Sequence, residues 1–387
     1  NFTVTYSLKN DLQSAGDNWL KFLPLNYTIL PQIYGEFTGL HYIDQYSIFF
    51  LFENMILYSQ EDYTFQTNEG NTIFLAQGDI FSKRLRKVAN EFTGYSGSVD
   101  PNSFINTRFG TFYLDRYRKK LFQWTGQLKE LVGVSSFLET YLSNTNPGYK
   151  NSLVTVYDNF TGMLFFTDKL TGWTISYSPY TDGFVSFHSF VPDWYLTMPN
   201  NFCSVKNNGI WKHNKKYDYQ RYYGVVNNFD VGFVEVQQED SELQSISVVV
   251  DFIKVEDYKK FAYSKKFFDQ VFVYNNNSST GLLNLLLKDR NDRTQSLSQN
   301  KEGQAEVTRV KGNTFNINKL ENNHSQGAIL EYQSNGMYYS PLNIVDKPPT
   351  LRESIKGKWN VIHLRVAQSD KIILQLNEPL TDAINQK

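Results

Sequence analysis

Residues 110–126 read GTFYLDRYRKKLFQWTG, two apolar runs separated by a polar break that begins with Asp115. Aromatic and β-branched residues are typical of strands, and Asp followed by polar residues favours a turn. The stretch therefore predicts an antiparallel β-hairpin.

The same pattern recurs along the chain. IFFLFENMILYSQ at 48–60, LVTVYDNFTGMLFFTD at 153–168 and TISYSPYTDGFVSFHSF at 174–190 all have it, and residues 194–214 contain Asn-Asn and Asn-Asn-Gly turns. Asn and Gly tolerate the positive φ angles that tight hairpin turns need. Further strand pairs are predicted at 245–253, 265–276, 305–320 and 357–376.

The spacing of these hairpins favours repeated sheets. The interval from Phe50 to Tyr113 is 63 residues, from Tyr113 to Val156 it is 43, and from Val156 to Cys203 it is 47. The last two intervals fit the roughly 40–50 residues of a four-stranded propeller blade, and the first leaves room for an insertion. We expect an all-β fold, a β-propeller-like array of about five to seven antiparallel blades. Tandem β-sandwiches are the alternative.

The array is expected to form a single propeller-type domain over residues 1–380. Residues 288–304 contain almost no apolar side chain and are expected to form an exposed polar loop, followed much later by a C-terminal tail at 381–387. One or two short helices are expected, at 83–91 and 129–142. The chain begins at Asn1 within strand-like sequence, so we also expect it to be part of a longer polypeptide.

Composition excludes several function classes. The 38 basic and 39 acidic side chains give a net charge of -1, so no global field attracts nucleic acid or an anionic membrane. The single cysteine, Cys203, excludes an intrachain disulfide and is expected to be a small buried hydrophobe. Neither metal-ligand spacing of the five histidines nor a nucleotide-binding or nucleophile-elbow motif is present, so no cofactor and no metal are expected.

Three aspartates at strand ends have two interpretations. Propeller glycosidases place a pair of acids near the axis, which makes Asp115, Asp158 and Asp182 candidates for catalysis. An Asp in a turn also accepts hydrogen bonds from backbone amides, and a repeated hairpin needs it in each copy. Because Asp115 and Asp158 occupy equivalent positions in successive hairpins, we favour turn anchors and expect no catalytic residue.

Aromatic residues crowd the middle of the sequence. Trp173, Trp194, Trp211, Tyr222 and Tyr223 could bind a glycan. Tyr and Trp are also favoured in packed interfaces, so these residues are equally candidates for seams between sheets or contacts between subunits.

Three stretches carry a family resemblance. They are GDNWLKFLPLNYTILPQIYGEFTGLHYIDQYSIFFLFENMILYSQEDYTFQTNEG (16–70), TGYSGSVDPNSFINTRFGTFYLDRYRKKLFQWTG (93–126) and TISYSPYTDGFVSFHSFVPDWYLTMPNNFCSVKNNGIWKHN (174–214), followed by YQRYYG (219–224). These stretches resemble the tail nozzle, muzzle or "stabilisation" proteins of short-tailed, crAss-like bacteriophages. The resemblance extends over most of residues 15–365.

The resemblance implies a structural protein with propeller or platform domains and no catalytic residues. It implies a ring, usually of about six copies, at the virion tail tip, assembled in the host cytoplasm and gating a channel for DNA and ejected proteins. The implied partners are further copies of the chain, the tail hub and fibres, the remainder of its own polypeptide, DNA in transit and the host cell surface. A propeller glycoside hydrolase or glycan-binding module is the competing hypothesis.

Overall fold

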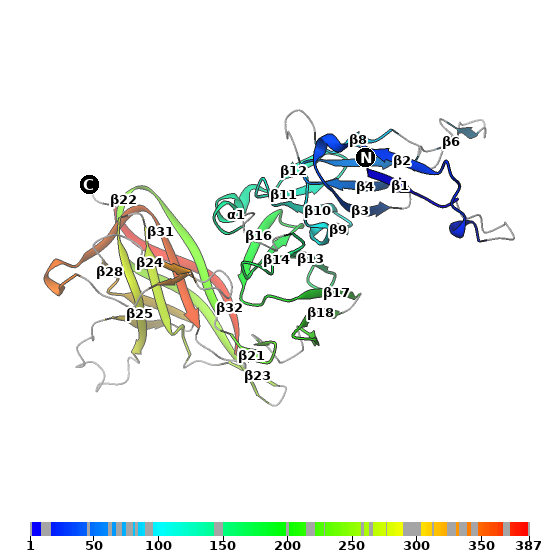
Figure 1. Cartoon of the computed structure of the whole chain (residues 1–387). Helices are drawn as coiled ribbons and strands as arrows, with labels where there is room; N and C mark the ends of the chain where they lie inside the picture. The colour runs from blue at the N-terminus through cyan, green and yellow to red at the C-terminus, as the bar shows by residue number, and fades with distance from the viewer. Residues whose placement is uncertain are drawn as a thin grey trace. The chain divides into compact units, whose positions relative to one another are not determined.

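The computed structural model divides the chain into two compact units, residues 1–210 and residues 211–387 (Figure 1). It describes residues 2–8, 17–44, 47–60, 64–66, 72–74, 80–81, 84–89, 96–142, 150–198, 201–213, 221–227, 229–256, 259–262, 266–275, 277–288, 303–311, 313–322, 330–332, 339–341, 347–366 and 372–385. Compact units of contact need not be separate folding domains, so the single domain over residues 1–380 stays a prediction.

Four antiparallel sheets follow one another along the first unit, and the last strand of the fourth sheet ends two residues beyond it. The first sheet contains β3 (Phe37–Asp44), β4 (Ser47–Phe52), β5 (Ile56–Gln60) and β8 (Arg86–Lys87). The second contains β9 (Ile105–Thr107), β10 (Gly110–Asp115), β11 (Lys120–Trp124) and β12 (Leu128–Glu130). The third contains β13 (Leu153–Asp158), β14 (Met163–Asp168), β15 (Trp173–Ser178) and β16 (Gly183–His188). The fourth contains β17 (Trp194–Met198), β18 (Asn201–Lys206) and β19 (Gly209–Lys212).

The predicted spacing is confirmed by these sheets. Phe50, Tyr113, Val156 and Cys203 lie in β4, β10, β13 and β18, one in each successive sheet. The long first interval contains the separate hairpin of β6 (Thr64–Gln66) and β7 (Thr72–Phe74). Cys203 is buried, as predicted. The all-β class and the array of antiparallel hairpins are therefore confirmed, whereas closure into a propeller and its blade count stay predictions.

Neighbouring sheets pack through aromatic rings. Residues Phe49 to Phe52 are all fully buried, and because side chains alternate along a strand, both faces of β4 must be covered. The ring of Phe49 lies 5.1 Å from that of Trp124 in the second sheet. The ring of Phe165 stacks on Phe202 at 4.9 Å and so joins the third sheet to the fourth.

Short elements flank the sheets. β1 (Phe2–Thr5) pairs with β2 (Tyr27–Leu30), with the 3-10 turns η1 (Asn18–Leu20) and η2 (Gln32–Tyr34) on either side of β2. A third 3-10 turn, η3 (Pro101–Ser103), precedes β9.

The two predicted helices have different outcomes. The one at 129–142 is confirmed in its second half, where η4 (Val132–Val134) leads into α1 (Ser135–Tyr141). The helix predicted over 83–91 is wrong for its described residues, because Arg86 and Lys87 pair with β5 as the edge strand β8. None of the helices in the described ranges has the length and apolar character to cross a membrane.

The second unit is built around one long strand. β22 (Phe229–Glu256) has 28 residues, and its pairing register shifts between Val236 and Ser241 and again between Leu243 and Ser245. Such irregularities bend a strand. The residues before the second shift pair with β31 (Glu353–Val366), and those after it pair with β27 (Thr314–Asn318).

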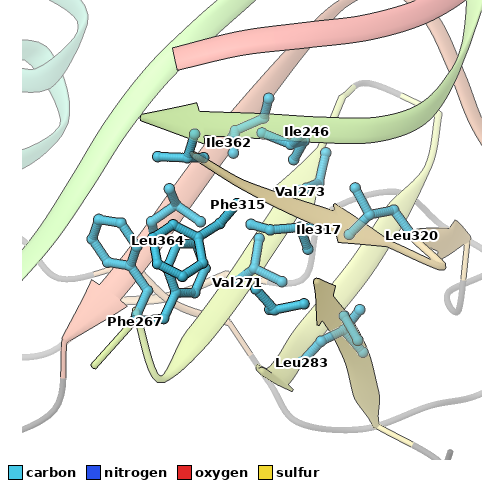
Figure 2. Close-up of a cluster of buried hydrophobic side chains, with 14 of the residues drawn as sticks. Ile246, Phe267, Val271, Val273, Leu283, Phe315, Ile317, Leu320, Ile362 and Leu364 are labelled. Carbon is cyan, nitrogen blue, oxygen red and sulfur yellow. The ribbon is translucent and has the colours of Figure 1, made fainter. Parts of the chain in front are cut away.

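A six-stranded barrel results from this bend. From β27 the pairing continues through β26 (Gln304–Lys311), β25 (Ser279–Lys288) and β24 (Gln270–Tyr274) to β31, which returns to β22. β25 and β26 are parallel. Figure 2 shows the apolar side chains that fill the interior, including Ile246, Phe267, Val271, Phe315 and Ile362, all at most 4% exposed.

Several predicted strand pairs in this unit are arranged differently. The hairpin at 305–320 is confirmed by β26 and β27, but 245–253 is an inner part of β22 and 265–276 contributes the single strand β24. The strands predicted at 357–376 exist as β31 and β32 (Ile372–Asn385), and each pairs with β22.

The remaining segment predictions concern chain ends and loops. β32 extends to Asn385, into the tail predicted at 381–387. Of the polar loop predicted at 288–304, residues 289–302 lie outside the described residues. Lys288 is the last residue of β25, Gly303 directly precedes β26, and Gln304 is the first residue of β26.

Candidate functional site

Asp158 and Asp168 hold two copies of one turn. In the first, Asp158 accepts hydrogen bonds from Phe160 N at 3.0 Å and Thr161 Oγ1 at 2.7 Å. In the second, Asp168 accepts them from Leu170 N at 3.1 Å and Thr171 Oγ1 at 2.8 Å. A glycine at positive φ closes each turn by donating to the carbonyl of its aspartate. The turns read DNFTG at 158–162 and DKLTG at 168–172, ten residues apart.

Asp115 anchors the turn between β10 and β11. Its carboxylate is fully buried and accepts hydrogen bonds from Gly97 N at 2.9 Å and Arg118 N at 3.1 Å, together with the Arg118 guanidinium at 2.9 Å. Burial raises the pKa of Asp115, although these partners favour its charged form. Both oxygens are therefore engaged inside the protein, away from any substrate.

Asp182 lies on the surface, in the turn between β15 and β16. Its φ is 51°, a left-handed conformation that Asp tolerates, and its carboxylate contacts Lys129 Nζ at 2.6 Å. The hydrogen bond from Lys129, together with one from Tyr177, lowers the pKa of Asp182. Because Lys129 belongs to β12, this exposed ion pair joins the second sheet to the third.

The five predicted aromatic residues do not form one cluster. Trp173 is fully buried, with its ring 5.2 Å from that of Phe137 in α1. Trp194, in β17, is 43% exposed. The ring of Tyr223 lies 5.6 Å from Trp211, and the rings of Tyr222 and Tyr223 lie 5.3 and 5.4 Å from that of His213. Burial lowers the pKa of His213 to about 4, so this small group is uncharged at neutral pH.

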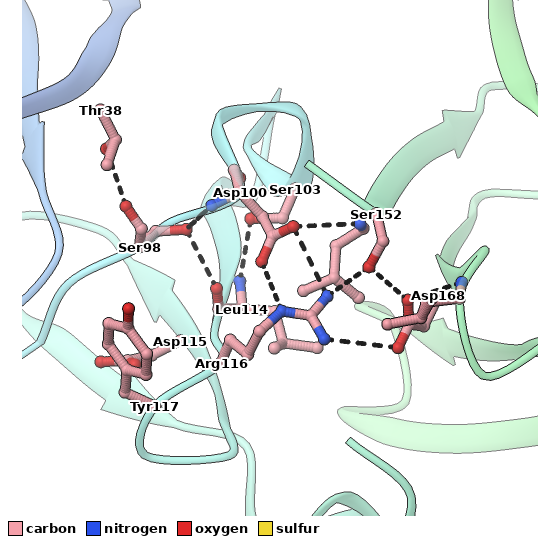
Figure 3. Close-up of polar contacts among 12 residues, drawn as sticks. Thr38, Ser98, Asp100, Ser103, Leu114, Asp115, Arg116, Tyr117, Ser152 and Asp168 are labelled. Carbon is pink, nitrogen blue, oxygen red and sulfur yellow. Dashed lines mark hydrogen bonds and ion pairs between the residues drawn. The ribbon is translucent and has the colours of Figure 1, made fainter. Parts of the chain in front are cut away.

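A buried group of polar residues was not predicted from the sequence. Arg116, in the turn after β10, is fully buried together with Asp100 and Asp168 (Figure 3). Its Nε donates to Asp100 at 2.8 Å, and its Nη1 lies 3.5 Å from Asp168. Its Nη2 donates to Ser152 Oγ at 2.6 Å, and Ser152 in turn donates to Asp168. We call these four residues the Arg116 cluster.

The Arg116 cluster joins three segments. Asp100 precedes η3, which leads into the second sheet, and it also accepts a hydrogen bond from Leu153 N, the first residue of β13, at 3.2 Å. Asp168 ends β14, so the guanidinium connects the second sheet to two strands of the third. Burial raises the pKa of Asp100, and the hydrogen bond and charge of Arg116 act against that rise.

Removing one carboxylate from a buried guanidinium strongly destabilises a fold, because an uncompensated charge then stays in the interior. The cluster is closed to solvent, so it fixes the position of two sheets and presents no group to a ligand.

The repeated D-x-x-T-G spacing is a sequence signal for the turn of Asp168. Its contact with Arg116, 52 positions away, has no such signal.

A depression in the described surface has none of the predicted site residues in its lining. An open depression of about 370 Å³ lies between the second, third and fourth sheets, and none of the predicted tryptophans lines it. Its lining residues are Ile105, Asn106, Thr107, Arg108, Tyr157, Asn159 and Thr197. In the described part of the chain, no three His, Cys, Asp or Glu side chains are grouped as metal ligands.

A known protein family matches the first part of the chain. Residues 2–208 match the family model described as Crassvirus muzzle protein. The matched region contains the first three sheets, strands β17 and β18 of the fourth, and the whole Arg116 cluster. A comparison with curated proteins finds no match.

Proposed function

Because the chain belongs to the Crassvirus muzzle protein family, a family of structural phage tail proteins, we propose that copies of it form a ring that closes the tail channel and lets DNA and ejected proteins leave. The match over residues 2–208 carries this proposal. The ring stands at the tail tip, is assembled in the host cytoplasm, and contacts other tail proteins such as the hub and fibres. DNA contacts it only in transit.

The packing between sheets in the first unit is suited to the wall of a channel. A wall beside moving DNA must keep its shape, and adjacent sheets joined by a buried ion cluster resist sliding past one another more than sheets joined by apolar contacts alone. The net charge of -1 also suits a conduit, since a strongly basic lumen would hold the phosphate backbone through counterion release.

The geometry of the candidate acids gives the glycan-directed alternative less support than the tail function. A catalytic acid must reach its substrate. Asp115 and Asp158 are buried and accept hydrogen bonds within their own turns, and Asp182 is paired with Lys129. The aromatic residues are divided between a buried seam and separate surface positions.

The test is the composition of purified virions. Peptide mapping of isolated tails, combined with particle imaging, is expected to place this chain at the tail tip in a ring of several copies. Virions that contain no peptide of this chain would contradict the proposal, as would a copy that lies outside the tail.

A further inference from the structure

A strip of apolar side chains stands uncovered on the first unit. Between positions 19 and 33, eight large apolar residues are each at least 44% exposed, and Leu25 and Ile33 exceed 80%. We call the segment from residue 17 to residue 34 the apolar strip. Scattered exposed hydrophobic residues are normal, but this density over so short a segment is not.

The backbone holds the strip in place. Phe2 and Val4 of β1 and Leu30 of β2 pack against the core of the first sheet. On the opposite face of the same hairpin, Tyr27 and Ile29 point outward, because side chains alternate along a strand. One face of the β1–β2 pair therefore packs against the core, and the side chains on its other face are exposed.

Further hydrogen bonds fix the remainder of the strip. Leu8 N donates to Lys21 O at 2.9 Å, and Tyr6 N donates to Asn26 O at 3.1 Å. The carbonyl of Leu23 accepts from Asn26 N at 3.0 Å. The strip is therefore a formed surface, and a partner would not have to order it.

The size of the strip matches a protein interface. With roughly 150–250 Å² for each large side chain, the exposed fractions leave on the order of 1,000 Å² of apolar surface. A stable interface of standard size buries about 800 Å² on each partner.

The small number of charged residues in the strip favours a protein partner over a membrane. Asp17 and Lys21 are the only residues among its 18 that are charged at neutral pH. A membrane-binding surface would combine its apolar face with several Lys or Arg side chains, which this strip does not have. Depletion of charge around aromatic and aliphatic anchors is instead typical of the core of a protein interface.

We propose that the apolar strip is a contact between copies of this chain, with the outward side chains of Phe22, Leu25 and Ile33 as its anchors. The inference rests on the proposed ring, because each copy in a ring must bury one surface against the next copy and a different surface against the previous one. The strip is one of these two surfaces.

The test compares two triple variants of the full chain by sedimentation velocity over a range of concentrations. Phe22→Ser, Leu25→Ser and Ile33→Ser together remove three exposed anchors of the strip. Phe160→Ser, Ile210→Ser and Val236→Ser together form the matched control, since these side chains are 71–75% exposed and lie outside the strip. Circular dichroism should show both variants folded, because no buried side chain changes.

The unmodified chain and the control should form multimers of the 45.0 kDa protomer. The strip variant should dissociate at least about a hundredfold more readily, as expected when three interface anchors are truncated. A strip variant that assembles like the unmodified chain would overturn the inference and leave the proposed ring intact.

Two other outcomes separate the inference from the proposed function. If the unmodified chain is monomeric at every concentration, the proposed contact between two copies is wrong. Detection of the chain in virion tails would then assign the strip to a contact with another tail protein. If the strip variant alone dissociates but virions do not contain the chain, the self-contact stands and the tail function fails.

Discussion

Asp158 and Asp168 hold the same turn, but only Asp168 also contacts Arg116 and Ser152. This pair of residues separates what a turn contributes from what the Arg116 cluster contributes. Replacing either aspartate by Asn keeps the shape of the side chain and removes its charge.

We expect Asp158→Asn to lower the free energy of unfolding of the first unit by about 1 kcal/mol, the usual value of a lost hydrogen bond. Asp168→Asn should lower it by about 3 kcal/mol or more, because the buried guanidinium loses one of its two carboxylates. Urea denaturation of both variants measures the difference. Equal costs would mean that the cluster adds nothing to stability.

His188 makes the stability of the first unit depend on pH. Its ring packs beside those of Phe165 and Phe190, each 5.2 Å away, and its Nε2 has no hydrogen-bond partner among the described residues. Burial lowers the pKa of His188 to about 4, from 6.5 in an unfolded chain. The unfolded state therefore binds the proton first, so the contribution of His188 to stability is complete above pH 6.5 and is lost as the pH falls towards 4.

His188→Phe should remove this pH dependence. Relative to the variant, the unmodified protein is expected to lose about 2 kcal/mol of unfolding free energy between pH 7 and pH 5. Denaturation midpoints of both proteins at the two pH values provide the measurement. Parallel pH profiles would show that the imidazole is protonated equally easily in the folded and unfolded states.

The residue-level predictions from sequence were strongest for local contacts. Asp115, Asp158 and Asp182 each accept hydrogen bonds within or beside their turns, which a turn pattern predicts. The partnership of Arg116 with Asp100 and Asp168 depends on how sheets stack. Sequence spacing contains no information about it, so this cluster could not be predicted.

At the scale of elements, two glycines in one hairpin have different constraints. Gly110 and Gly126 both have positive φ, 114° and 95°. A Cβ on Gly110 would lie 2.4 Å from the carbonyl oxygen of Trp124, whereas a Cβ on Gly126 would meet nothing within 4 Å.

Gly126→Ala should therefore cost only backbone strain, about 1–2 kcal/mol. Gly110→Ala adds a clash with backbone at the start of β10 and should cost clearly more, and Gly110→Val should prevent the hairpin from forming. Thermal unfolding of the alanine variants compares the two positions. A melting temperature unaffected by Gly110→Ala would show that β10 begins elsewhere.

Strands were predicted better than helices for a physical reason. Apolar runs such as 48–52 are buried on both faces and define strands without further information. Residues 83–91 are mostly charged, so their local pattern is weak, and pairing of Arg86 and Lys87 with β5 decides their structure. In this segment, strand pairing with β5 outweighs the weak local preference for a helix.

At the scale of the molecule, the two compact units should respond separately to core damage. Asp168→Asn should increase backbone hydrogen exchange in β13 and β14 and leave the barrel strands β24 and β31 unchanged. Ile362→Ala, which empties part of the barrel interior, should have the opposite pattern. Exchange measured by mass spectrometry on peptides of the full chain tests this, and spreading of either effect across both units would show that they unfold together.

The barrel was the part of the fold that the sequence did not predict. Its strands are individually recognisable, but its closure depends on the bend in β22 and on pairing between segments far apart in the chain. Sequence periodicity specifies that a strand exists and which side chains it buries. It does not specify the partner.

The pairing of β22 has a consequence for the order of folding during synthesis. Val231 pairs with Leu364, which is 133 positions later, whereas strands in the second and third sheets pair with their immediate neighbours. The local sheets can therefore form while the ribosome is still translating the remainder of the chain, but β22 must wait for β31 and β32. During that interval its unpaired backbone N–H and C=O groups are open to other nascent chains, so a translational pause before residue 353 would favour aggregation, and a chaperone that binds extended strands would increase the yield of the barrel.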